Sequence, residues 1–230
     1  PKQPFMGTFN GSGFTIDGLT INRPEENYVG LFGYSVNSSY KNINIDNASI
    51  AGYSIIGGVV GIISSSYDPF VITNTSFSGD VVGTSSQCGG VAGIVNSVDG
   101  AAIINTLSYG TINCDLFSGG IVGQFGGSSL IVKGVSFEGT ILTQANSAGL
   151  LGQFQGGEMS IQNSSSKGEI RSKNETQMHS VGGLLGLAYR IDIFRLENSD
   201  SDMNIYSLSD GSRIGGLVGQ LNFPDYSNIN

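Results

Sequence analysis

A glycine-containing pentapeptide recurs seven times along the chain, and it constrains the fold more than any other feature. Its last copy reads Gly-Gly-Leu-Val-Gly over residues 215–219, and successive copies are 28 to 34 residues apart. Repetition at a period of about 20 to 50 residues is typical of architectures in which each repeat is one unit that stacks on the next. The second residues of the seven copies are Gly30, Gly58, Gly90, Gly120, Gly149, Gly183 and Gly216.

A second block of similar sequence follows each of the first six motifs. The blocks favour β-branched and aromatic residues in short alternating runs between turn formers, which is typical of strands, and no stretch shows a useful 3.6-residue apolar period. One column of the aligned blocks is glycine and is broken only by Met203; it contains Gly52, Gly79, Gly110, Gly139 and Gly168. A column five residues earlier is asparagine, with Gly134 as the exception; it contains Asn47, Asn74, Asn105, Asn163 and Asn198.

Repeats of this length built only from short strands and turns predict an all-β fold, a β-solenoid with one coil per repeat. We therefore expect about seven coils of roughly 30 residues in a single domain over residues 1–230. Parallel pairing would stack successive coils about 4.8 Å apart, so that like residues lie on like residues. The asparagine column is then expected to form a structural ladder of amide bonds along the axis, which needs no ligand.

The opening "FMGTFNGSGFTIDGLTI", followed by "VGLFG" and the repeated "GGLVG", resembles the GLUG-motif repeats of large surface and secreted proteins. Similar repeats occur in bacterial adhesins and in the amino-terminal region of streptococcal immunoglobulin A proteases. The resemblance implies a right-handed, single-stranded parallel β-helix and an extracellular or cell-surface location. The chain begins with Pro1, and its final "YSNIN" matches the strand entry "YKNIN" at residues 40–44, so we expect a fragment of a longer repeat protein.

The two residues after each glycine pair are apolar in every repeat. Neighbouring residues of a strand point to opposite faces, so we assign the first to the core and expect the second to face outward unless the glycines bend the strand. Either loops cover the resulting ridge or a partner lies along it, such as another solenoid or a second copy. The candidate partner ridge consists of Phe32, Val60, Ala92, Val122, Leu151, Leu185 and Val218.

Sequence variation between repeats is concentrated in one connection, whose longest example is the segment 169–182. Insertions in solenoids often gather on the binding edge. This segment is either a solvated polar loop or a contact site for an acidic sugar or a protein, with Arg171, Lys173, Glu175 and His179 as candidates. The sequons at Asn37 and Asn174 are expected in loops, where a secretory host could glycosylate them.

Composition argues against several classes of function. The net charge is −8, and no Lys or Arg occurs between Lys41 and Lys133, so we expect neither nucleic-acid binding nor docking on an anionic membrane. No apolar run is long enough to insert into a bilayer. A single histidine and scattered acidic residues suggest no catalytic arrangement, no metal site and no cofactor. Cys88 and Cys114 are either two inert thiols or a pair joined across adjacent repeats.

We therefore expect a non-catalytic extracellular module, a rigid spacer or adhesion scaffold of a cell-surface or secreted protein, with a protein or glycan as its partner. One alternative is a structural subunit that packs laterally into a filament or larger assembly through the apolar ridge. Another is an accessory substrate-binding region of a secreted protease.

Overall fold

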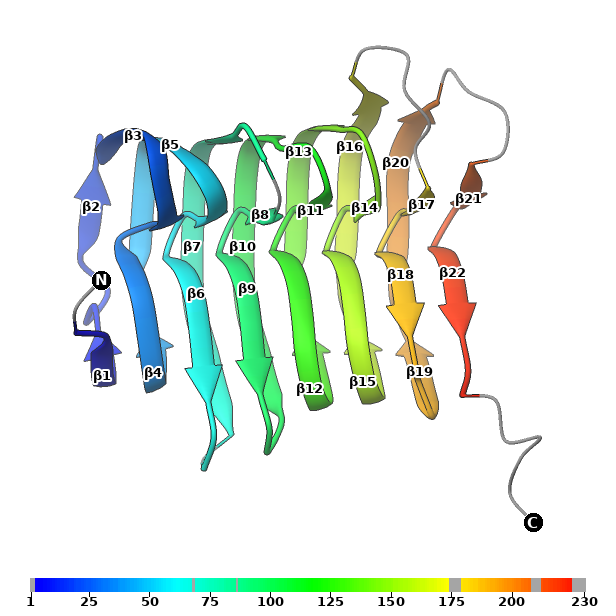
Figure 1. Ribbon diagram of the computed structural model, residues 1–230, viewed down its shortest axis with the longest axis horizontal. Coiled ribbons are helices and arrows are strands. Elements are labelled where there is room, and N and C mark those ends of the chain that lie inside the picture. The colour runs from blue at the N-terminus through cyan, green and yellow to red at the C-terminus, as the bar shows by residue number, and fades with distance from the viewer. Residues whose placement is uncertain (1–2, 68, 86, 174–178, 208–211, 225–230) are drawn as a thin grey trace.

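The protein winds into a right-handed parallel β-helix. The computed structural model describes residues 3–67, 69–85, 87–173, 179–207 and 212–224, and these form strands and turns without a helix. Strands on the near face run downward and strands on the far face run upward while the chain advances from left to right (Figure 1). The predicted β-solenoid is confirmed, with about seven turns of about 31 residues.

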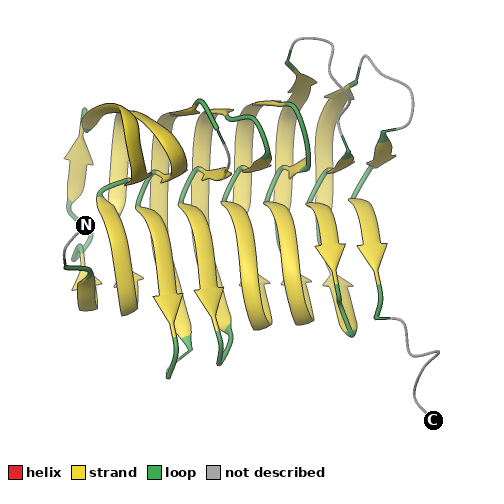
Figure 2. Ribbon diagram, viewed as in Figure 1, coloured by secondary structure: helices red, strands yellow, loops and turns green. Residues whose placement is uncertain are grey.

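The near face is built from the strands that contain or follow the glycine motif. Three of them, β4, β12 and β15, continue around the lower corner, whereas a short loop follows β6 and β9 there (Figure 2). These strands are β4 (Phe32–Lys41), β6 (Val60–Ser65), β9 (Ala92–Ser97), β12 (Val122–Lys133), β15 (Leu151–Gln162), β18 (Leu185–Tyr189) and β22 (Val218–Asn222).

The remaining strands complete each coil. The long upward strands are β5 (Asn44–Gly57), β7 (Phe70–Gly83), β10 (Ala101–Asn113), β13 (Ser136–Thr143), β16 (Ser165–Ser172), β19 (Ile193–Glu197) and β20 (Asp200–Tyr206). Short strands then lead into the motif: β8 (Gln87–Gly89), β11 (Phe117–Gly119), β14 (Ser147–Ala148), β17 (Ser180–Gly182) and β21 (Arg213–Gly215). The chain begins with β1 (Phe5–Asn10), β2 (Thr15–Asp17) and β3 (Thr20–Val29).

Equivalent side chains lie on top of one another through the core. All strand pairs are parallel, and one interior column runs through every coil from β3 to β20. Its five central members are buried, and each contributes roughly 1.5–3 kcal/mol by leaving water. The column consists of Ile21, Ile50, Val81, Ile112, Ile141, Ile170 and Ile205.

Asparagines occupy one corner of the coil because the backbone there is left-handed. Asn74 and Asn105 have φ values of 50° and 48°, a conformation that Asn and Gly tolerate best. The Asn105 amide donates to Asn74 Oδ1, and the Asn74 amide donates to Asn42 Oδ1, both at 3.2 Å. Gly134, with φ 63°, takes the next rung. Asn163 and Asn198 are left-handed as well, with φ values of 48° and 46°.

The assignment of Asn47 to this column was wrong. Lys41 is in register with Thr73, which puts Asn42 on the rung of Asn74. A register shift between Ile45 and Ala48 then displaces Asn47, whose amide donates instead to Asp17 Oδ1 at 2.9 Å. Gly52 likewise pairs with Gly83 and not with Gly79. The sequence alignment matched Gly52 to Gly79, an offset of 27 residues, whereas the strands pair at an offset of 32 before the bulge and 31 after it.

The second glycine of each motif lies at a bend where the next coil passes close by. A β-carbon on Gly58 would overlap the ring of Phe77, and one on Gly120 would overlap the ring of Phe137. Gly58 and Val59 form the bend, and the strand begins only at Val60. The motif therefore recurs because, in its first six copies, a β-carbon on the second glycine would also meet a carbonyl of the next coil.

A disulfide joins two coils beside the short strands. Cys88 in β8 and Cys114, which follows β10, are bonded, with their Cα atoms 6.0 Å apart. Both are fully buried. Of the two states left open by the sequence, the structure has the cross-link between adjacent repeats.

Candidate functional site

The proposed apolar ridge does not face solvent. Five of its members lie in the buried core: Val60, Ala92, Val122, Leu151 and Leu185. Phe32 and Val218 are half-buried and pack against the same core, where the Phe32 ring contacts those of Phe5, Phe9 and Tyr40. The prediction failed because the residue before each of these lies in a bend, so strict strand alternation does not begin there and both positions point inward.

Of the candidate contact residues of the segment 169–182, Arg171 and Lys173 lie near the upper edge and bond to other residues of the chain. The Arg171 guanidinium donates to Glu169 at 2.7 Å and lies 4.4 Å from the centre of the Tyr206 ring on the next coil. Its hydrogen bond and charge lower the pKa of the Glu169 carboxyl, and Glu169 in turn raises the pKa of Arg171. Lys173 Nζ lies 2.8 Å from Asp115 Oδ1.

The Arg171–Tyr206 contact joins β16 to β20 on the next coil, and the Lys173–Asp115 pair joins residues of different coils, whereas Glu169 and Arg171 both lie in β16. Of the other two candidates, His179 is exposed, and its carbonyl accepts a hydrogen bond from the Arg213 amide at 2.8 Å. Glu175 lies outside the described residues. Because Arg171 and Lys173 already have acidic partners, the cluster presents less free charge than the sequence suggested.

The two candidate sequons differ from their expected setting. Asn37 lies within β4 and not in a loop, at a left-handed corner with φ 46°. Its Oδ1 accepts a hydrogen bond from the Ser66 amide at 2.9 Å, so the side chain stabilises the turn between coils. Asn174 lies outside the described residues.

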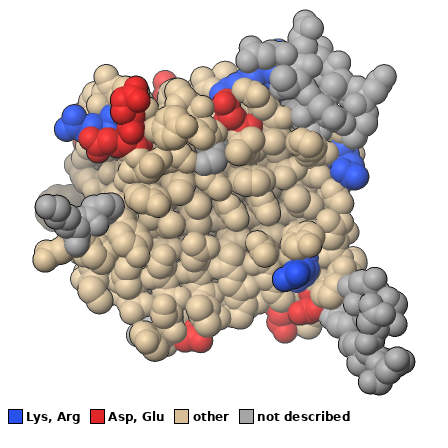
Figure 3. All heavy atoms as spheres, in the orientation of Figure 1, with Lys and Arg blue, Asp and Glu red and all other residues tan. Residues whose placement is uncertain are grey.

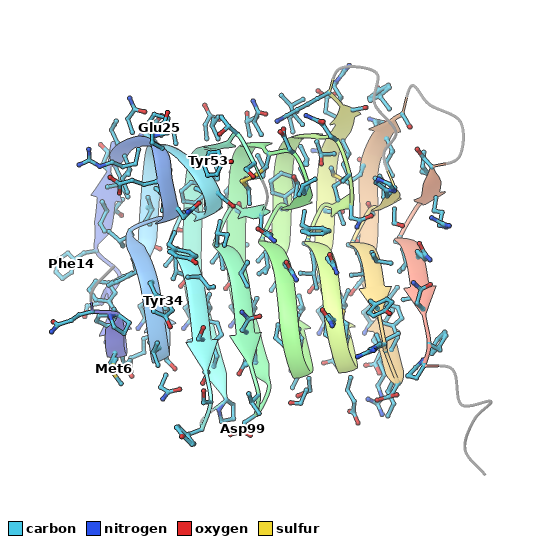
Figure 4. All side chains as sticks on the ribbon, in the orientation of Figure 1. Met6, Phe14, Glu25, Tyr34, Tyr53 and Asp99 are labelled. Carbon is cyan, nitrogen blue, oxygen red and sulfur yellow. A yellow bond between two sulfur atoms is a disulfide. The ribbon has the colours of Figure 1, made fainter. Side chains whose placement is uncertain are left out.

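The near face of the solenoid carries almost no charge. Charged side chains gather at its margins, while its middle is uncharged (Figure 3). Strands β6, β9, β18 and β22 contain no Asp, Glu, Lys or Arg. Tyr34 on β4 projects from this face, whereas Met6 and Phe14 lie at the first coil (Figure 4). The face is therefore suited to uncharged contacts more than to ionic ones.

Among the described residues, no group of three or more His, Cys, Asp and Glu side chains is placed to hold a metal ion. The same residues contain no helix of the length and hydropathy that crossing a membrane requires.

Comparison with known proteins gives two similarities. A segment of 96 residues, 41% of this chain, is 38% identical to halomucin from Haloquadratum walsbyi and covers 1% of that protein's length. The crystal structure of a putative immunoglobulin A1 protease from Bacteroides ovatus superposes on 94% of this chain and 68% of its own, with a TM-score of 0.69 and 21% identity. The second similarity supports the fold alone. No protein-family model matches the chain, so the resemblance to GLUG repeats stays a prediction.

Proposed function

We propose that this chain is a non-catalytic extracellular module that acts as a rigid spacer and adhesion scaffold within a larger cell-surface or secreted protein. The observation that carries the proposal is the uninterrupted axial stacking of the coils, from Ile21 in β3 to Ile205 in β20. Strands of each described coil pair in parallel with strands of the next, so the unit resists bending and stretching as a flexible linker cannot.

The disulfide supports an extracellular location. Disulfides persist in oxidising compartments and are rare where cellular thiols keep cysteines reduced. Cys88 and Cys114 are joined in the core, where the bond holds neighbouring coils in register. The match to 1% of halomucin supports the further point that segments of this kind occur as small parts of very long chains.

Dispersal of the acidic side chains supports the absence of catalysis. Five acids among the described residues, on different strands or turns, each lie within 4.0 Å of a Lys or Arg nitrogen, as structural ion pairs do. These acids are Glu26, Asp115, Glu138, Glu158 and Glu169. Lateral packing into a filament through the apolar ridge loses its basis, because that ridge is buried. The accessory protease role stays a prediction, since the likeness to the protease structure is one of fold.

Antibodies against this module, applied to intact cells that express the full-length protein and to their medium, test the proposal. We expect labelling of the cell surface or recovery from the medium without permeabilisation. Replacing the module with a Gly/Ser linker of equal residue number should broaden the separation between epitope tags on its two flanks and raise its mean from about 30 Å to about 80 Å, because a flexible coil of this length spans more than seven stacked coils do. An unrelated seven-coil solenoid should preserve the short, narrowly distributed separation. Labelling only after permeabilisation would contradict the proposal, and so would a separation between the tags that does not change when the linker replaces the module.

A further inference from the structure

Two adjoining hollows open at the lower corner of the solenoid, between β12, β15 and the turn after β18. The first, of about 540 Å³, has a floor of glycine residues in β12 and β15 and walls that include Gln155, Arg190 and Asp192. The second, of about 470 Å³, is lined by Tyr189, Asn222 and Phe223. Arg190 and Pro224 line both hollows, so the two form one continuous depression across four coils, those of β12, β15, β18 and β22.

The first hollow exists because Gly126 has no side chain. Gly126 is in register with Asn96 on the preceding coil, and Gln155 and Tyr189 continue the same column on the next two coils. A β-carbon on Gly126 would meet only the Asn96 Oδ1 atom, at 2.8 Å, and that atom ends a flexible side chain. At Gly127, by contrast, a β-carbon would overlap the Ser97 carbonyl. Packing therefore requires glycine at 127 but not at 126, where glycine keeps the hollow open.

Arg190 lies on the shared wall in spite of an unfavourable backbone. Its φ is 58°, and the equivalent corner of the second coil is occupied by Asn37 with φ 46°. Asparagine tolerates this conformation, whereas a long side chain does so at a cost of roughly 1–2 kcal/mol. The guanidinium lies 5.6 Å from the centre of the Tyr189 ring, which fixes it between the hollows. The strained backbone at Arg190 lowers the stability of the coil, so the stability of the fold does not explain why an arginine occupies this position.

The chemistry around the depression fits a sugar chain. Arg190 donates hydrogen bonds, the Asp192 carboxylate accepts them, and the Gln155 amide does both, which matches hydroxyl groups that donate and accept. Asn222 Oδ1 accepts a hydrogen bond from Gln220 Nε2 at 2.7 Å, which leaves its Nδ2 as the donor toward the depression. The Asp192 amide donates to the Gly157 carbonyl at 2.7 Å, so this residue is held at the rim. The rings of Tyr189 and Phe223 are 42% and 61% exposed, and such rings pack against the C–H face of a pyranose.

The charge of the depression selects among glycans. Arg190 and Asp192 contribute one charge of each sign, and the remaining lining side chains are uncharged. An acidic ligand would meet Asp192 and a protein of net charge −8, while a basic one would meet Arg190. We propose that this depression binds a neutral oligosaccharide, with consecutive sugars in the two hollows. This goes beyond the spacer role, which needs no ligand, and it supplies the ligand class for the adhesive part of the proposed function.

Titration calorimetry of the 230-residue chain with neutral tetrasaccharides of glucose, mannose, galactose and N-acetylglucosamine tests the proposal, with hyaluronan and chitosan fragments as charged comparisons. We expect at least one neutral tetrasaccharide to bind at millimolar concentration or below, and the corresponding disaccharide to bind at least tenfold more weakly. No binding by any neutral tetrasaccharide, or tighter binding of a charged fragment, overturns the proposal and leaves the surface-labelling test of the spacer role unaffected.

Variants locate the site. Arg190→Asn should weaken binding by tenfold or more while leaving the melting temperature unchanged or raised, because asparagine relieves the left-handed backbone. Gly126→Gln should abolish binding by filling the first hollow. Tyr67→Ser, which removes an exposed ring elsewhere on the solenoid, is the control and should bind like the unmodified chain. Binding that survives both Arg190→Asn and Gly126→Gln shows that the sugar occupies another surface and overturns the assignment.

Discussion

At the scale of single residues, the asparagine corner combines two requirements in one side chain. The backbone needs a residue that tolerates positive φ, and the amide then bonds to the coil before it and the coil after it. Gly134 meets only the first requirement and still occupies the same corner. The backbone requirement is therefore the stricter one, and the amide ladder adds to it.

Substitutions at Asn74 separate the two contributions. Asn74→Gly keeps the left-handed backbone and removes two amide bonds, so we expect a loss of about 1 kcal/mol in the free energy of unfolding. Asn74→Ala also adds backbone strain, and the loss should rise to about 2–3 kcal/mol. Urea unfolding followed by circular dichroism measures both. Equal losses for the two variants would mean that the backbone conformation contributes nothing.

The column that includes Gly110 requires glycine more strictly than the asparagine corner requires asparagine. Gly110 has φ 122°, and a β-carbon there would overlap the Gly79 carbonyl of the preceding coil. Gly110→Ala should therefore cost about 3 kcal/mol or more, through strain and a steric clash that the stack cannot relieve. Gly13 is the matched control, since its φ is 77° and nothing lies within 4 Å of a β-carbon there. Gly13→Ala should cost only about 1 kcal/mol, and a similar cost for the two variants in urea unfolding would contradict this account of the column.

The ion pair at the upper edge makes a prediction about pH. Arg171 lowers the pKa of Glu169, so the pair stabilises the fold above the carboxyl's unfolded pKa, and this contribution is lost as pH falls through the lower folded pKa. Arg171→Gln should raise the pKa of Glu169 toward its ordinary value. A titration followed by NMR of the side-chain carboxyl measures the shift. An unchanged pKa in the variant would show that the pair does not form in solution.

At the scale of secondary-structure elements, the disulfide ties the residue after the long strand β10 to the short strand β8, which leads into the motif on the preceding coil. The bond closes a loop with a sequence separation of 26 residues. Removing it restores conformational freedom to the unfolded chain, worth about 3.5 kcal/mol in the chain-entropy treatment.

The variant with both Cys88→Ala and Cys114→Ala should unfold at a lower urea concentration by an amount equivalent to about 2–4 kcal/mol. Cys88→Ala alone should lose a similar amount, because one thiol cannot form the bond. A single variant that is much more stable than the double variant would indicate that packing of the sulfur atoms, and not the cross-link, accounts for the effect.

The same elements show what strand periodicity cannot predict. The assignment of the first residue after each glycine pair to the core was correct at Val59, Val91 and Leu184, where all three are fully buried. Alternation failed at Val60 and Leu185, because the bend at the glycine pair precedes each of them and turns consecutive side chains inward. Glycine permits the backbone angles of this bend but does not require them. The motif therefore identifies where the chain turns, but not whether the side chains after the turn point inward or outward.

At the scale of the whole molecule, the period of the glycine motif was sufficient to predict the fold. Stacking follows from repetition, because residues that recur once per coil must lie in one column. The depression at Arg190 could not be predicted in this way, since it depends on departures from the repeat. Gly126 interrupts a column of larger residues, and Arg190 has a left-handed backbone at a corner where the four preceding coils have Ser65, Ser97, Gly127 and Gly156 without one. The two residues are 64 positions apart in the sequence, and only the coil register brings them together.

Distances between spin labels along the axis test the stacking most directly. Positions 22 and 206 lie in one outer column and are separated by six coil steps, about 29 Å, whereas positions 82 and 206 are separated by four, about 19 Å. Labels on Asn22→Cys with Tyr206→Cys, and on Val82→Cys with Tyr206→Cys, should give two narrow distance distributions in pulsed electron resonance. Their means should differ by about 10 Å, a difference in which the length of the label cancels. Broad distributions, or two means that do not differ by about two coil steps, would contradict a single axial stack.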